Sequence, residues 1–239
     1  MDLKAKIAII LVLVSVAGLP MPTRGEAQED SSQHFAGGKS EDTVLSYLRP
    51  TLRATGYAGR VYYSGACKAD GLEFVAFPEV RVHPAERNAA FEAVREMFQE
   101  DAEVKVVEEP HKIISVTVGK PLTALLDAKI SLFRTAPIAQ YNPPLAIGAV
   151  ENTKEVKAAM AKLGLRVPLQ LSAQLLAKPS SGLPHLPVET KDTTVDQVLD
   201  SIAVTFRGMV VYGTCVQPDG KGLLEIDFVG LDGPDKPQP

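Results

Sequence analysis

Residues 186–212, LPVETKDTTVDQVLDSIAVTFRGMVVY, contain three local structural signals in a row. Val188 begins a short extended segment, and Thr194 is a residue type that commonly caps helices. An amphipathic helix is predicted from Thr194 to about Phe206, and a strand is predicted over 209–214 after a glycine. The order of strand, capped helix and strand predicts a small α+β unit.

This unit extends in both directions along the chain. A turn at 218–220 leads to a last strand over 223–229, which gives an antiparallel hairpin, and residues 231–239 are predicted to be a disordered tail. Upstream, Asn152 or Thr153 is expected to cap a helix that Gly164 ends, and a short strand is expected over 167–171. Residues 152–230 therefore form the second predicted unit.

The first predicted unit covers residues 40–133 and also combines helices with a hairpin. A helix capped by Ser40, strands over 60–66 and 72–77, a helix after Pro84, and strands over 104–107 and 114–118 are expected. Pro121 is expected to open another helix, whose core stripe is Leu122, Leu125, Leu126, Ile130 and Phe133. Residues 134–151 have three prolines and no clean hydrophobic period, so we interpret them as a connector.

The two units share an order of features, which suggests an internal repeat. In each, a Thr-Val pair is followed by a strand with Tyr and Gly, then Cys, an Asp-Gly turn and a second strand. The alternative is that any helix-plus-hairpin unit reuses these residue types. The predicted fold class is α+β, with two helix-plus-antiparallel-hairpin units.

The N-terminus has the pattern of a signal peptide. Lys4 and Lys6 precede an apolar run over 7–19, and small residues at Gly25 and Ala27 favour cleavage after Ala27. The run is shorter than the roughly 20 residues that a membrane helix needs. We therefore expect a signal peptide over 1–27, a flexible linker over 28–39, no membrane-spanning segment after cleavage, and a periplasmic or secreted protein. The alternatives are a buried apolar helix and an uncleaved anchor.

The charge balance disfavours one class of partner. The chain has 25 basic and 29 acidic residues, a net charge of −4, whereas nucleic-acid binding favours a basic face. No nucleic-acid partner is expected.

Cys67 and Cys215 are the only two cysteines of the chain. In an oxidising compartment an even cysteine count favours a disulfide, so pairing of Cys67 with Cys215 is predicted, with two buried thiols as the alternative.

No motif for catalysis, a cofactor or a metal survives inspection. Gly37-Gly38-Lys39-Ser40 lacks the earlier glycine and the preceding strand of a phosphate-binding loop. The histidines, His34, His83, His111 and His185, lack metal-ligand spacing. An acidic cluster, Glu100, Asp101, Glu103, Glu108 and Glu109, falls at a helix end and a turn, where solvated charge is usual. No catalytic residue, cofactor or metal ligand is therefore assigned.

The segment 186–229 resembles the short N-terminal module of secretins and TonB-dependent receptors, through Thr194, Val195, Gln197, Val198, Leu199 and Asp200. The resemblance implies a small α+β protein-interaction module in the cell envelope and transfers no functional residue. We expect a non-enzymatic module that binds an envelope protein or a small ligand; the alternative is a periplasmic hydrolase with a site assembled from scattered polar residues.

Overall fold

A computed structural model describes residues 39–66, 90–98, 103–167, 182–216 and 219–232. The helices of this part are α1 (Lys39–Thr55), α2 (Ala90–Met97), α3 (Thr123–Leu126), η1 (Ala139–Tyr141, a 3-10 helix), α4 (Pro143–Glu151), α5 (Lys154–Lys162) and α6 (Val195–Thr205). The strands are β1 (Ala58–Ala66), β2 (Val104–Glu109), β3 (Ile113–Val118), β4 (Lys129–Arg134), β5 (Leu165–Arg166), β6 (Glu189–Thr194), β7 (Gly208–Val216) and β8 (Gly222–Gly230). The predicted α+β class is confirmed.

One mixed sheet contains strands from both predicted halves. Its order is β2-β3-β1-β7-β8-β5, and β4 and β6 form a separate two-stranded sheet. The halves meet where β1 and β7 run parallel, with Gly59 beside Met209 and Gly65 beside Cys215. Because both described partners of β1 are parallel whereas β7 pairs antiparallel with β8, the internal repeat is not confirmed. Residues 72–77, the other strand of the expected first hairpin, lie outside the described residues.

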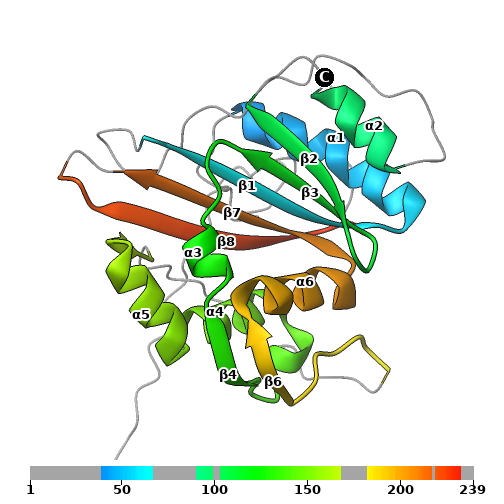
Figure 1. The fold of residues 1–239 in the computed structure, drawn as a ribbon. Coiled ribbons are helices and arrows are strands. Elements are labelled where there is room, and N and C mark those ends of the chain that lie inside the picture. The colour runs from blue at the N-terminus through cyan, green and yellow to red at the C-terminus, as the bar shows by residue number, and fades with distance from the viewer. Residues whose placement is uncertain (1–38, 67–89, 99–102, 168–181, 217–218, 233–239) are drawn as a thin grey trace, which may run out of the picture. The chain divides into compact units, whose positions relative to one another are not determined.

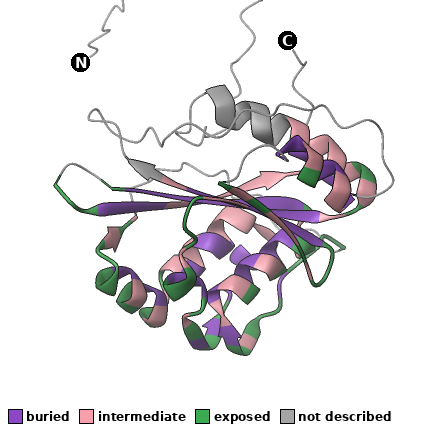
Figure 2. Cartoon of the chain, turned by 45° about the horizontal axis from the view of Figure 1, so that its top comes forward, coloured by how far each residue is buried: buried purple, intermediate pink, exposed green. Residues whose placement is uncertain are grey.

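Helices cover both faces of the six-stranded sheet (Figures 1 and 2). On one face Leu48 and Leu52 of α1 and Val94 of α2 pack against the sheet. On the other face α4 and α6 pack against the sheet and are covered in turn by Ile130 and Phe133 of β4. Two apolar cores therefore lie on opposite sides of the sheet.

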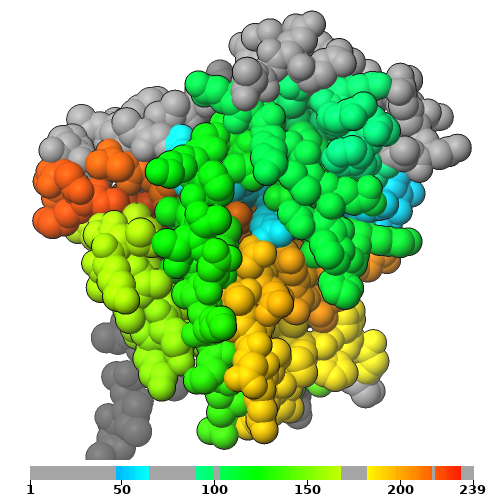
Figure 3. Space-filling model, in the orientation of Figure 1, coloured from blue at the N-terminus to red at the C-terminus, as the bar shows by residue number. Residues whose placement is uncertain are grey.

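Within the described residues, β2 and β5 are the two end strands of the large sheet, and β2 pairs antiparallel with β3 through the register Val104 to Val118. Figure 3 shows the surface of β2 and β3 on the face nearest the viewer. No helix of the described part is long and apolar enough to cross a membrane.

Two local predictions are wrong. The helix expected from Pro121 to Phe133 is short: α3 ends at Leu126, and β4 begins at Lys129. Ile130 and Phe133 are buried as expected, but they belong to strand β4. The pairing of β4 with β6 is interrupted between Ser131 and Asp192, and Asp192 has a positive φ of 49°. This irregularity buries residues three apart, which imitates helical spacing.

The segment expected to be a connector contains a helix that contributes to the core. Asn142 caps α4, with its side-chain oxygen accepting a hydrogen bond from the backbone N–H of Leu145 at 3.0 Å. Pro143 and Pro144 fill the first positions of α4, where a missing N–H costs nothing. Ile147 and Val150 are buried.

Other local predictions are confirmed. Thr153 caps α5, and Gly164 follows it with a φ of 64°. Thr194 caps α6 in a reciprocal capping box with Gln197, and the strands predicted over 104–107, 114–118, 209–214 and 223–229 correspond to β2, β3, β7 and β8.

Candidate functional site

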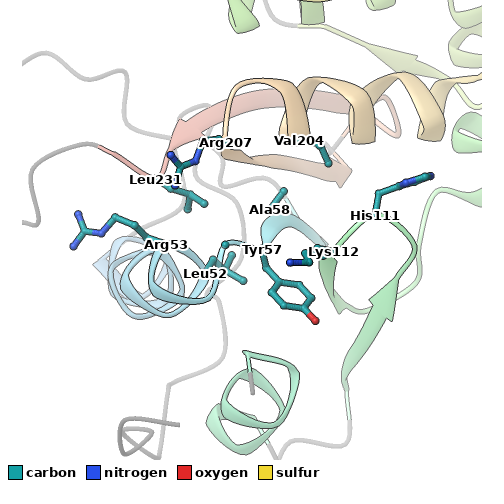
Figure 4. A pocket seen from close by; sticks show the side chains of 10 residues that line it. Leu52, Arg53, Tyr57, Ala58, His111, Lys112, Val204, Arg207 and Leu231 are labelled. Atoms are coloured by element: carbon teal, nitrogen blue, oxygen red, sulfur yellow. The ribbon is translucent and has the colours of Figure 1, made fainter. Parts of the chain in front are cut away.

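A cavity of about 190 Å³ lies at one end of the large sheet. It lies where α1 and α6 end, where β1 begins, and where the β2–β3 turn and the end of β8 meet (Figure 4). The described residues that line it are Leu52, Arg53, Gly56, Tyr57, Ala58, His111, Lys112, Val204, Arg207 and Leu231. Four separate parts of the sequence therefore build one site.

Backbone hydrogen bonds hold these segments together. After α1, Gly56 has a φ of 71°, and the N–H of Tyr57 donates to the carbonyl of Leu52 at 3.1 Å. The N–H of Ala58 donates to the carbonyl of Lys112 at 2.9 Å, which joins the start of β1 to the β2–β3 turn. The N–H of Leu231 donates to the carbonyl of Arg207 at 3.1 Å.

Unusual backbone conformations concentrate at this cavity. Among the described residues four non-glycine residues have positive φ, and His111 (64°), Lys112 (59°) and Arg207 (50°) all line the cavity. Side chains other than glycine are disfavoured in this region, and such residues cluster at functional sites. The tight β2–β3 turn and the end of α6 both require it, so the fold explains the conformation but not the absence of glycine.

Four residues of the lining have basic side chains. These are Arg53, His111, Lys112 and Arg207, and none of the described lining residues is acidic. Arg53 lies in the last turn of α1 and Arg207 follows α6, where cations interact favourably with the helix dipoles. Figure 4 shows Arg53 and His111 directed outward on opposite sides, whereas Lys112 and Arg207 stay close to the apolar lining.

The walls of the cavity are apolar. Leu52, Leu231 and Ala58 are buried, and Val204 is partly exposed on α6. The Tyr57 hydroxyl donates a hydrogen bond to Glu108 at 2.6 Å, outside the lining. This bond, with smaller effects of burial and of the Glu108 charge, raises the pKa of Tyr57, so the phenol stays neutral. The site thus combines apolar walls with neighbouring cations, the pattern of a pocket for an amphiphilic anion.

An ion-pair cluster centred on Arg60 of β1 lies on the face of the sheet that α6 covers. Arg60 is buried and pairs with Asp196, with Asp200 at 3.5 Å and with Glu109 at 3.9 Å. Burial raises the pKa of Asp200; the charges of Arg60 and His111 oppose this effect and that of Glu109 adds to it. Since three carboxylates occupy one guanidinium, the cluster fastens α6 and β2 to β1 rather than offering a free charge.

Two tyrosines extend this polar region along the sheet. The rings of Tyr62 and Tyr212 are 4.9 Å apart, and the hydroxyls of Tyr62 and Thr214 are 3.1 Å apart. Burial raises the pKa of both phenols, so neither is a base near neutral pH.

The structure brings together few of the residues that the sequence singled out. His111 lines the cavity, whereas His185 is exposed and its ring lies 5.4 Å from that of Tyr141. In the part of the chain that is described, no group of three His, Cys, Asp or Glu side chains is arranged to hold a metal ion. Glu108 and Glu109 form the contacts given above, and Lys39 and Ser40 lie in the first turn of α1. His34, Gly37, Gly38, Cys67, His83, Glu100 and Asp101 lie outside the described residues.

Sequence reasoning did not single out Arg53, Lys112 or Arg207. One usable signal was Arg207, because an arginine stands at the end of α6 where glycine is common. Another was the Pro110-His111-Lys112 turn between two strands, which lacks the Asn or Gly that such turns favour.

Comparison with models of known protein families, with curated proteins and with solved structures finds no match for this chain. The resemblance of residues 186–229 to the secretin and TonB-receptor module therefore stays a prediction.

Proposed function

We propose that this chain is an exported, non-enzymatic binding protein of the cell envelope, and that its cavity holds a small ligand with an anionic group. One observation carries the proposal: apolar walls and four basic residues line the same cavity, while no described lining residue is acidic. In a chain whose net charge is −4, this local excess of positive charge favours an anion.

The size of the cavity limits the ligand. An apolar cavity of about 150 Å³ is large enough for benzene, so about 190 Å³ accommodates one ring or a short alkyl group. The ring would contact Leu52, Val204 and Leu231, and a carboxylate would lie near Lys112 or Arg207. Benzoate has both features and is a suitable probe.

The hydrolase alternative gains no support from this cavity. Its described lining contains no serine, cysteine, aspartate or glutamate. Its one histidine, His111, points outward, and the Tyr57 hydroxyl is bonded to Glu108. A nucleophile with a neighbouring base, as covalent catalysis needs, is not found among these residues.

Titration of the exported chain with benzoate tests the proposal, with the shift in thermal unfolding as the readout. A ligand of this size is expected to bind with a Kd of about 1 mM. Lys112→Met keeps much of the aliphatic stem but removes the charge, so we expect it to weaken benzoate binding about tenfold, a typical effect of losing a charged hydrogen bond. Benzyl alcohol, which has the ring without the charge, should bind more weakly than benzoate.

Lys162→Met is the matched control, because Lys162 is exposed on α5 and does not line the cavity. It should leave benzoate binding unchanged. Equal losses in Lys112→Met and Lys162→Met, or no thermal shift with benzoate at all, would count against the cavity as the binding site.

A further inference from the structure

Strand β2 lies at one end of the large sheet as far as the residues are described. Within the described residues its only partner is β3, and the opposite edge of the strand has no neighbour. An open edge presents backbone N–H and C=O groups that can pair with another chain. Lys105 and Glu108 on this strand are exposed, and Val107 is half-buried.

We infer that β2 is the surface through which two copies of this chain associate, by antiparallel pairing of one β2 with the other. The partner is a second copy because the order of charges along Val104–Glu109, VKVVEE, is complementary to itself in one register.

The geometry of the sheet limits the registers. A two-fold axis perpendicular to the sheet joins two β2 edges antiparallel and keeps each side chain on its own face. Directly opposed residues must then both have even numbers or both have odd numbers, because side chains alternate between faces. The odd residues Lys105, Val107 and Glu109 share the face on which Glu109 meets Arg60.

Charge selects among the registers that remain. With Val107 on the two-fold axis, Lys105 of each copy lies opposite Glu109 of the other, and no like charges are opposed. With Val106 on the axis, Glu103 lies opposite Glu109, and with Glu108 on the axis two copies of Glu108 meet. With Lys105 on the axis two lysines meet, and with Glu109 on the axis two glutamates meet. With Val104 on the axis Glu103 lies opposite Lys105, but only residues 103–105 can then pair within the described segment. Opposite charges stabilise a cross-strand pair and like charges destabilise it, so the register centred on Val107 is favoured.

The side chains are arranged for this pairing. Lys105 forms no ion pair within the described part of the chain. The Glu109 side chain is 35% exposed and its nearest cation, Arg60, is 3.9 Å away, which leaves an oxygen accessible to a second cation. Charged residues on an edge usually prevent pairing between sheets; here the register turns them into attractive pairs. Pro110 lies opposite Val104 and, without an N–H, ends the ladder.

The expected dimer is weak, because five residue pairs bury less surface than a permanent interface. Sedimentation equilibrium of the full exported chain should show a concentration-dependent monomer–dimer equilibrium. Lys105→Glu creates two opposed pairs of glutamates and should raise the dimer Kd by at least about tenfold. Lys191→Glu, an exposed position on β6, makes the same change in net charge and should leave the Kd unchanged.

A mixing experiment tests the register. Glu109→Lys alone opposes two lysines and should also weaken the dimer, whereas an equal mixture of Lys105→Glu and Glu109→Lys restores both opposite-charge pairs. We expect the mixture to form heterodimers with a Kd close to that of the wild type. Since Glu109→Lys places a second cation near Arg60, Val107→Cys offers an independent measurement: the two introduced thiols would face each other across the axis and form an intermolecular disulfide on oxidation.

A wild-type chain that stays monomeric up to about 1 mM overturns the inference, because a dimer with a higher Kd would not be populated at ordinary protein concentrations. So does a dimer whose Kd is the same in Lys105→Glu and Lys191→Glu, because such a dimer forms through another surface.

Discussion

At the scale of single residues, Arg207 combines an unfavourable backbone with a place in the candidate site. Its φ is 50°, directly after α6, where an L-residue costs roughly 1–2 kcal/mol relative to the right-handed region. Its carbonyl accepts the N–H of Leu231, so the fold needs this conformation. Glycine meets that need without strain, which suggests that the guanidinium is retained for what it does at the cavity.

Two substitutions at this position separate stability from binding. Arg207→Gly relieves the strain and should raise the free energy of unfolding by about 1 kcal/mol, as measured by urea denaturation. Arg207→Ala keeps the strain and should give no such gain. Both remove the guanidinium, so both should weaken benzoate binding. Stabilisation by alanine as well as glycine would show that the backbone conformation is not the cause.

At the scale of secondary-structure elements, two half-buried acidic residues, Glu151 and Glu225, lie on α4 and β8, which are in contact. Burial raises the pKa of Glu151, at the end of α4, to about 7, and the charge of Glu225 on β8 adds to the effect. Burial likewise raises the pKa of Glu225 to about 7, with a contribution from Asp227. A carboxylate at the C-terminal end of α4 is also opposed by the helix dipole. The contact between these elements therefore favours the protonated acids.

The stability of the protein should fall as the pH rises through this range. Below about pH 4.5 both acids are protonated in the folded and unfolded states; above about pH 7 the folded state must hold the charges that burial disfavours. In Glu151→Gln the free energy of unfolding should fall by about 2 kcal/mol less between pH 5 and pH 8 than it does in the wild type. Denaturant titrations at several pH values measure this change.

Glu155→Gln is the control for this pH effect. Backbone and side-chain hydrogen bonds and Lys154 lower the pKa of the half-buried Glu155, so that group is ionised throughout the same range. The slope of stability against pH should then match the wild type. A slope unchanged in Glu151→Gln would contradict the assignment.

The elements also show which parts of the fold local sequence can predict. Helix α6 was predicted because Thr194 and the apolar period act within one segment, and the capping box with Gln197 depends on nothing distant. Strand β4 was mistaken for helix because its pairing with β6 skips Ser131, and Ile130 and Phe133 are buried three residues apart. That irregularity depends on Asp192 in the partner strand, about sixty residues away.

The candidate site was harder to predict than the fold, because no single segment contains it. Leu52 and Tyr57, the Lys112 turn, Arg207 and Leu231 come together only after β1 is inserted between β3 and β7. A cation at a helix end or in a turn is ordinary when seen alone. Several basic residues around one apolar cavity indicate an anion-binding site, and only the topology brings them together.

At the scale of the whole molecule, the pairing of β1 with β7 joins the two halves of the chain and bears on the predicted disulfide. The parallel register sets Gly65 beside the buried Cys215. The described residues include no free cysteine. Cys67 itself lies outside the described residues, so its pairing with Cys215 stays a prediction.

A disulfide between Cys67 and Cys215 requires their α carbons to lie within about 7 Å of each other.

Mass spectrometry of the exported chain without reductant tests the disulfide together with export. We expect an N-terminus at Gln28 and a mass about two units below that of the reduced form. Because the bond would close a loop of about 150 residues, its reduction should lower the free energy of unfolding by roughly 4 kcal/mol in the chain-entropy model. Cys215→Ser should lose the same stability and become insensitive to reductant. A chain that keeps Met1 and two alkylatable thiols would contradict both expectations.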